Sequence, residues 1–112
     1  MVTDNDEPII VGRSASPGRV EGEVIFITDE DGLENVNDTH IIVTKMTDMN
    51  MLAAMRLAAG VVTAEGGMLC HAAIQSREFK KPCVVGAGED VWIKLTPKQR
   101  ITIDGSTGKI YA

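Results

Sequence analysis

A change of hydrophobic period near the middle of this 112-residue chain constrains its fold more than any other feature. The apolar run HIIVT at 40–44 predicts a buried strand, and VVT at 61–63 predicts a second one. Between them, strong helix formers at 49–59 predict a helix of about three turns, with Thr47 or Asp48 as its N-cap. This order of elements predicts two parallel strands joined by a helical crossover.

Similar patterns on both sides extend this unit. EVIFI at 23–27 predicts a strand, and the acidic segment that follows it, 28–39, predicts a surface connection. A second helix is expected over 70–79, with Pro82 beyond its end, and CVVG at 83–86 predicts another buried strand. The centre of the chain therefore carries two helical crossovers.

The two ends of the chain predict antiparallel hairpins. The turn signal at 16–18, Ser-Pro-Gly, lies in a glycine-punctuated segment, and RITID and KIYA flank GSTG, where Gly105 and Gly108 are available for positive φ. We therefore expect a mixed α/β fold with two main helices. It forms one domain spanning residues 1–112, in which residues 1–10 are a partly ordered N-terminal extension.

Composition and charge exclude several classes of protein. The net charge is −5, and the basic residues are scattered except for the pair Lys80 and Lys81, which argues against nucleic-acid binding. No apolar stretch approaches the roughly 20 residues that span a bilayer, and the first eight residues are acidic rather than signal-like. We expect a cytoplasmic protein that binds no membrane. Cys70 and Cys83 lack the paired spacing of a zinc site and are expected to be reduced thiols, with no metal bound.

A glycine–histidine element follows the strand that ends near Thr63. Gly66 and Gly67 allow a sharp turn and a close approach to a ligand, and the helix expected after them directs free amides and its positive dipole end into that turn. Such a site favours a phosphate. His71 lies in the first helical turn, and a neutral imidazole is a nucleophile at cellular pH. The element therefore predicts a histidine that accepts a phosphoryl group.

Spacing alone leaves other interpretations open. His71 is also compatible with a buried or capping side chain, which is the more common role of a lone histidine in this setting. Cys70 as a thiol nucleophile with His71 as its base is disfavoured, because adjacent helical residues point about 100° apart. A metal site formed by Cys70, His71 and His40 would require a geometry that the sequence does not specify.

The segment GGMLCHAAIQSREFKKPCVVG at 66–86 resembles the phosphohistidine signature of the mobile (swivelling) domain of phosphoenolpyruvate-utilising enzymes, as in phosphoenolpyruvate synthase, pyruvate phosphate dikinase and enzyme I of the sugar phosphotransferase system. The similarity extends to SASPGRVEGEV, IIVTKMT, AAGVVTAEGG and ITIDGSTGKIY, and so covers almost the whole chain. The residues that match the signature are Gly66, Gly67, Cys70, His71, Ala72, Ala73, Ile74, Arg77, Glu78, Pro82, Val84, Val85 and Gly86.

The resemblance implies a layered swivelling β/β/α fold and a role in phosphotransfer. It implies that His71 is the phosphoacceptor, supported by Gly66, Gly67, Cys70, Thr63 and Arg77. The phosphoryl group would come from an ATP-grasp nucleotide-binding domain or from phosphoenolpyruvate on a TIM-barrel domain. These partners would supply Mg²⁺ with ATP or phosphoenolpyruvate, so that the present chain is a stand-alone carrier without a cofactor of its own.

Three residues depart from the family pattern. Leu69 replaces a usual Thr whose hydroxyl can hydrogen-bond near the histidine, Gln75 occupies a usually aliphatic position, and Met49 replaces a common Pro. Arg77 lies about 120° around an ideal helix from His71, so a contact with a neighbouring strand competes with phosphate binding as its expected role.

Other functions fit the same residues. One is a non-catalytic interaction or regulatory module that retains the fold while Leu69 accompanies the loss of phosphotransfer. The chain could equally be a piece of a larger synthase or dikinase. A lyase subunit of the related swivelling fold is disfavoured, because it would not need the signature around His71.

Overall fold

The structure is a computed structural model that describes residues 6–112, so part of the expected N-terminal extension, residues 1–5, lies outside the described residues. No helix in the described range is both long enough and apolar enough to cross a membrane. The strands are β1 (Ile10–Val11), β2 (Arg13–Ser16), β3 (Arg19–Ile27), β4 (His40–Thr44), β5 (Gly60–Thr63), β6 (Cys83–Val85), β7 (Arg100–Asp104) and β8 (Lys109–Tyr111). The helices are α1 (Leu52–Leu57), α2 (His71–Phe79) and α3 (Asp90–Lys94), with 3₁₀ helices η1 (Glu30–Asn35) and η2 (Met49–Met51).

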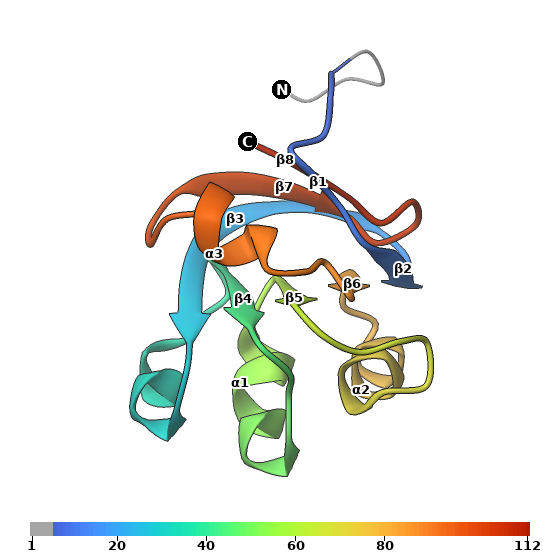
Figure 1. The fold of residues 1–112 in the computed structure, drawn as a ribbon. Coiled ribbons are helices and arrows are strands. Elements are labelled where there is room, and N and C mark those ends of the chain that lie inside the picture. Colours follow the sequence, from blue (N-terminus) through green and yellow to red (C-terminus); the bar gives the residue numbers. More distant parts are fainter. Residues whose placement is uncertain (1–5) are drawn as a thin grey trace.

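One curved sheet contains eight strands in the order β1-β8-β7-β3-β4-β5-β6-β2. The expected parallel pairing of β4 with β5 is confirmed, and α1 and α2 form the two expected crossovers, before and after β5 in the chain. β6 continues the parallel part next to β5, and β3 also pairs in parallel with β4, which the sequence did not predict. The long strand β3 pairs with β4 through its second half and antiparallel with β7 through its first half. It therefore joins the parallel and antiparallel parts of the sheet (Figure 1).

The N-terminal strands separate to opposite edges of the sheet. β1 pairs with β8 and β2 pairs with β6, although only Gly12 lies between them in the chain. The Gly12 N–H donates to the Gly108 carbonyl oxygen at 2.7 Å, so the two edges approach each other and the sheet curls. The expected N-terminal hairpin is therefore not formed, although β1 and β2 both pair antiparallel, as expected for this end of the chain. The Ser-Pro-Gly turn at 16–18 connects β2 and β3, which pair with different strands.

Side chains on the central strands alternate between two cores. Ile41 and Val43 of β4 belong to a cluster inside the curl that also includes Val91 of α3, whereas Ile42 faces a second cluster. The second cluster lies beneath α1 and α2, which contribute Met55 and other small or flexible residues. Because both faces of these strands are buried, the sequences of the strands are continuous apolar runs. The layered mixed α/β fold was expected; the short helix α3, under the arch of β3 and β7, was not (Figure 1).

The first crossover helix begins where the sequence predicted. The Asp48 side chain caps its start, because Oδ1 accepts from the Asn50 N–H at 2.9 Å, and Thr47 does not serve as the cap. The helix starts as the 3₁₀ turn η2 and continues as α1 to Leu57, two residues short of the expected end. Thr47 is thereby left available for another contact.

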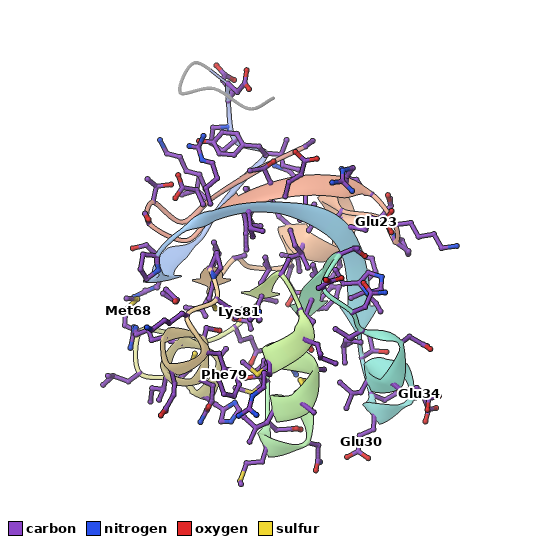
Figure 2. All side chains as sticks on the ribbon, turned by 180° about the vertical axis from the view of Figure 1, so that it is seen from behind. Glu23, Glu30, Glu34, Met68, Phe79 and Lys81 are labelled. Atoms are coloured by element: carbon purple, nitrogen blue, oxygen red, sulfur yellow. The ribbon has the colours of Figure 1, made fainter. Side chains whose placement is uncertain are left out.

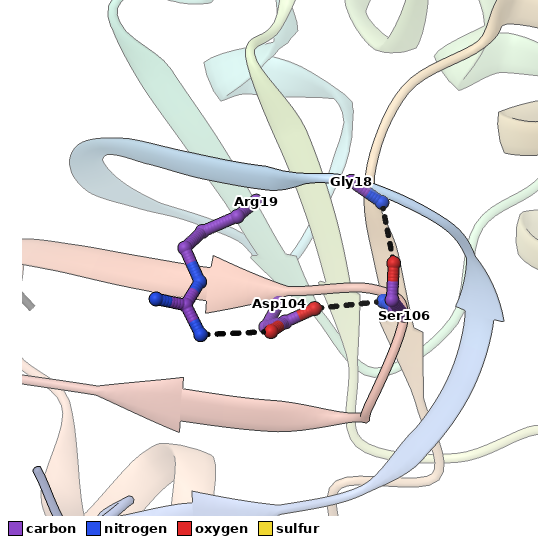
Figure 3. Close-up of polar contacts among 4 residues, drawn as sticks. All are labelled: Gly18, Arg19, Asp104 and Ser106. Carbon is purple, nitrogen blue, oxygen red and sulfur yellow. Dashed lines mark hydrogen bonds and ion pairs between the residues drawn. The ribbon is translucent and has the colours of Figure 1, made fainter. Parts of the chain in front are cut away.

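The C-terminal hairpin is tied to the start of β3 by polar contacts (Figure 3). Arg19 Nη2 donates to Asp104 Oδ2 at 3.0 Å, and Asp104 Oδ1 accepts from the Ser106 N–H. Gly108 adopts a positive φ of 80°, as expected. Gly105 does not have a positive φ and is required for a different reason: a Cβ there would lie 1.8 Å from the Ser16 carbonyl oxygen.

Candidate functional site

The two glycines in front of α2 have different structural roles. Gly66 has φ +105°, and a Cβ at this position would lie 2.8 Å from Cys70 Sγ. Both the backbone conformation and the available space therefore favour glycine. A Cβ on Gly67 would meet nothing within 4 Å, so Gly67 contributes an open surface in front of the helix.

The helix start is open as well. Cys70 is the N-cap of α2 in extended conformation, with φ −73° and ψ 165°, and its side chain makes no capping hydrogen bond. Its carbonyl accepts from the Ile74 N–H at 3.1 Å, which is the first intrahelical bond. The amides of the first turn have no intrahelical acceptors, and they form the positive end of the helix dipole. A nine-residue helix therefore presents donors beside its first residue, His71.

The His71 ring is held by one hydrogen bond. Its Nδ1 lies 2.7 Å from Thr47 Oγ1, and its Nε2 is buried without a hydrogen-bond partner. If Nδ1 carries the proton and donates to Thr47, Nε2 retains its lone pair. In that direction of the contact Nε2 is the nucleophilic nitrogen, whereas donation from the Thr47 hydroxyl to Nδ1 would place the proton on Nε2.

Sequence reasoning considered Thr47 only as a helix cap and missed its contact with His71. Thr47 is 5% exposed and lies just beyond the carboxyl end of β4. The register pairs Thr44 of β4 with Thr63 of β5, so the loops that leave these neighbouring parallel strands emerge at the same edge of the sheet. Placing the strand ends side by side would have identified Thr47 as a neighbour of the glycine turn.

The hydroxyl beside the histidine thus comes from a different part of the chain than expected. Leu69, at the position where the family usually has Thr, is 85% exposed. Thr47, 24 residues before His71, makes the hydroxyl contact with the ring. The absence of a hydroxyl at Leu69 therefore does not leave the imidazole without a partner.

Thr63 and Arg77 both stabilise the turn rather than the ring. Thr63 Oγ1 donates to the Glu65 carbonyl oxygen at 2.5 Å. Arg77 donates from Nε to the Ala15 carbonyl oxygen at 2.7 Å and from Nη2 to the Met68 carbonyl oxygen at 2.8 Å. Met68 lies on the loop in front of α2 (Figure 2). Arg77 thus links this loop to β2. A contact of this kind, with a neighbouring strand, was the expected alternative to phosphate binding by Arg77.

The two cysteines lie in different environments. Burial raises the pKa of the Cys83 thiol to about 12, and its Sγ donates to the Ala72 carbonyl oxygen at 3.9 Å. Cys70 is partly exposed beside Gly66. Between residues 6 and 112, no three His, Cys, Asp or Glu side chains are grouped closely enough to hold a metal, and His40 instead accepts from the Asn37 N–H at the start of β4.

Comparison with known proteins gives a family match. The family model described as the PEP-utilising enzyme, mobile domain, where PEP is phosphoenolpyruvate, matches residues 36–108. A probable phosphoenolpyruvate synthase of Methanothermobacter thermautotrophicus is 43% identical over 105 residues. The aligned region covers 94% of this chain but 15% of the relative, so the chain spans a small part of that protein's length.

Two solved structures share the fold. Aconitase X of Thermococcus kodakaraensis, in its holo-form, has a TM-score of 0.66 at 18% identity, covering 91% of this chain and 95% of that chain. Enzyme I (nEIt) has a TM-score of 0.58 at 24% identity, covering 70% and 32%. At these identities the similarity concerns the fold alone. Since proteins with such different names share it, function has to be argued from the site.

Proposed function

The chain belongs to the family of the PEP-utilising enzyme mobile domain, and on this basis we propose that it carries a phosphoryl group on His71. The observation that carries the proposal is the position of this ring. His71 is the first residue of α2, with Nδ1 held by Thr47 and Nε2 left without a partner.

In the proposed step, the Nε2 lone pair attacks the phosphorus of the donor. The N–P bond forms as the bond from phosphorus to the bridging oxygen breaks, and that oxygen leaves with the electron pair. Before the ring turns toward the donor, an Nδ1–H bond to Thr47 Oγ1 keeps the proton on Nδ1 and the lone pair on Nε2. The first-turn amides of α2 and the open surface at Gly67 favour the phosphoryl oxygens.

Transfer requires a movement of the side chain. Because Nε2 is buried in the structure, the imidazole has to rotate before this nitrogen reaches a donor. Rotation of a partly exposed side chain is fast compared with enzyme turnover. We infer that the structure represents the unphosphorylated, resting orientation.

The donor and its cofactors belong to partner domains in this proposal. The chain covers 15% of the length of the phosphoenolpyruvate synthase relative, which leaves room in that protein for other domains. We propose that an ATP-grasp domain and a phosphoenolpyruvate- or pyruvate-binding TIM barrel bind the substrates with Mg²⁺. The chain itself would contribute the acceptor nitrogen and move it between the two sites.

The test is transfer of phosphate in the presence of a partner. The protein is incubated with Mg²⁺, with ATP or phosphoenolpyruvate, and with a homologous phosphoenolpyruvate synthase whose own phosphoacceptor histidine has been replaced. Intact mass at alkaline pH should show one added phosphoryl group that is lost in acid. His71→Ala should abolish the adduct, and His40→Ala, which replaces the other of the two histidines, should retain it.

Two results would contradict the proposal. Equal labelling of the wild type and His71→Ala would place the phosphate elsewhere. A folded wild-type protein that binds the partner but is never labelled would instead support the interaction module as the function.

A further inference from the structure

A cavity separate from the glycine turn opens at the carboxyl ends of β3 and β4. Its volume is ≈ 400 Å³, which lies within the range of small-molecule pockets, about 300–1,000 Å³. The residues that line it come from the end of β3 and the segment after it, from η1, from the end of β4 and the segment that leads into η2, and from α3. It does not include His71, the glycines or the start of α2.

The inner wall of the cavity is apolar. Ile27 and Met51 are buried, Leu33 is half-buried, and Trp92 lies at the edge with 36% of its surface exposed. The Trp92 ring is fixed by a tilted contact with Phe26, with ring centroids 5.6 Å apart. The cavity therefore offers an aromatic surface that is held in place before any ligand arrives.

Three carboxylates lie at the cavity: Asp29, Glu30 and Asp48. Each uses one oxygen in a hydrogen bond, from the Asp31 N–H, from Asn50 Nδ2 and from the Asn50 N–H respectively. Among the described residues, none of the three forms an ion pair. The one cation in the lining, Lys45, lies 3.6 Å from Glu65 outside the cavity.

Negative charge continues beyond the cavity. A neighbouring hollow along η1 is lined by Glu30, Asp31 and Glu34, and Figure 2 shows Glu30 and Glu34 on this short helix. The carboxylates outnumber the basic groups across both hollows. An anionic ligand would be repelled here, whereas a cation would gain charge-assisted contacts without displacing an existing partner.

We propose that this cavity binds a small organic cation: an ammonium group on a short apolar or aromatic body. The ammonium would lie among Asp29, Glu30 and Asp48, and the body would pack on the apolar wall. The face of Trp92 adds a cation–π contribution within about 6 Å of its centroid. The volume limits the body to about the size of one ring with a short chain.

The same ligand would act on His71 through the segment that lines the cavity. Thr47 lies between Met46 and Asp48, which both contact the cavity, while its own hydroxyl contacts His71 Nδ1. A ligand that fixes residues 46–48 should change the strength of the Thr47–His71 hydrogen bond. This regulatory consequence rests on the proposed function, but binding itself does not.

Binding can be measured without any phosphotransfer, because Trp92 is the one tryptophan of the chain. The full chain is titrated with 2-phenylethylammonium, and with 3-phenylpropanoate as a probe of similar size and opposite charge. The change in tryptophan fluorescence should saturate as the ammonium is added. The affinity for the ammonium should fall when salt is added. It should not respond to the carboxylate beyond dilution.

Variants identify the site. Asp48→Asn removes one charge and retains a residue that can cap η2. Glu30→Gln removes a second charge. Each variant should weaken binding of the ammonium about tenfold. Asp90→Asn is the matched control, because Asp90 lies two residues from Trp92 on α3 and pairs with Lys94 outside the cavity lining. It should bind the ammonium as the wild type does.

Three outcomes would overturn parts of the proposal. Equal responses to both probes would exclude a cation site. Unchanged affinity for the ammonium in both Asp48→Asn and Glu30→Gln would also exclude it. Saturation without any change in the ¹⁵N shifts of the His71 ring would exclude the coupling to Thr47. Because none of these measurements involves phosphate, a failure here is distinct from a failure of His71 to accept a phosphoryl group.

Discussion

Thr47 Oγ1 and His71 Nδ1 lie 2.7 Å apart and join the loop after β4 to the first residue of α2. Thr47 is nearly fully buried, so this hydroxyl is a fixed part of the protein rather than a surface group that samples many positions. The pair orients the imidazole and distinguishes its two nitrogens. It also links residues 46–48, beside the cavity, to the candidate phosphoacceptor.

Replacing the hydroxyl of Thr47 should therefore affect both stability and the ring. Thr47→Val keeps the shape but leaves Nδ1 without its partner, which should lower the free energy of unfolding by about 1–3 kcal/mol. Urea unfolding measures the loss, and ¹⁵N shifts of the His71 ring report the tautomer. Thr47→Ser, which keeps the hydroxyl but loses a buried methyl group, should retain the wild-type nitrogen shifts and lose only about 1 kcal/mol. A Val variant with wild-type nitrogen shifts would show that the contact does not set the tautomer.

The two glycines before α2 make a matched pair for mutation. Gly66→Ala combines a positive φ with a Cβ 2.8 Å from Cys70 Sγ, and should destabilise the protein by more than about 1 kcal/mol. Gly67→Ala meets open space and should change stability by less than about 0.5 kcal/mol. Thermal or urea unfolding of both variants tests the difference, and equal effects would contradict the conformation of this turn.

The two thiols should react at very different rates. Alkylation requires the thiolate, and burial holds the pKa of Cys83 at about 12, whereas Cys70 is partly exposed. Intact mass after iodoacetamide treatment at pH 8 should show one adduct in the native wild type and almost none in native Cys70→Ser. In denaturant the same variant should gain one adduct. Rapid labelling of Cys83 in the native state would contradict its burial.

The raised pKa of Cys83 also has a consequence for stability at alkaline pH. Above the ordinary value of 9.0 the unfolded chain ionises this thiol, while the folded protein keeps it protonated up to about 12. Its contribution is therefore fully present below pH 9 and is lost as pH rises toward 12. Cys83→Ala should remove that part of the alkaline decline in unfolding free energy.

Much of the fold could be predicted from local patterns. The strands at β4, β5 and β6 and the helix α2 follow from apolar runs, helix formers and turn residues that are close together in the chain. The positions of β1 and β2 could not, because Ile10 pairs with Ile110 and Ser14 pairs with Val84. Such pairings depend on tertiary packing, and the turn at 16–18 suggested a local hairpin instead.

The candidate site, like the fold, could be predicted where its residues are consecutive in the chain and could not where they are distant. The glycine turn and His71 at a helix start could be predicted, because strand, glycines and helix are consecutive in the chain. The contact with Thr47 could not be, since it depends on the adjacency of β4 and β5. The five-residue helix α3 was also missed because it is too short for a helical period to emerge, although it places Trp92 at the cavity.

The contact between Arg19 and Asp104 predicts a loss of stability in acid. Burial by itself raises the pKa of Asp104, but the hydrogen bond from Arg19, the hydrogen bond from the Ser106 N–H and the charge of Arg19 outweigh it, so the pKa lies below its ordinary value of 3.8. A lowered carboxyl pKa stabilises the fold above about pH 3.8, and this stabilisation is lost as pH falls below that value.

Asp104→Asn tests this directly, because the amide oxygen can still accept from the Ser106 N–H while the charge is lost. The variant should unfold about 1 kcal/mol more easily at pH 7, a modest value because the Arg19 side chain is 36% exposed. The difference from the wild type should shrink as pH falls below 3.8, where the wild-type carboxylate is itself protonated. Glu21→Gln breaks an ion pair with Arg100 whose side chains are both more than half exposed, and should change little at either pH. A pH-independent difference for Asp104→Asn would mean that Asp104 acts through its shape and hydrogen bonds rather than its charge.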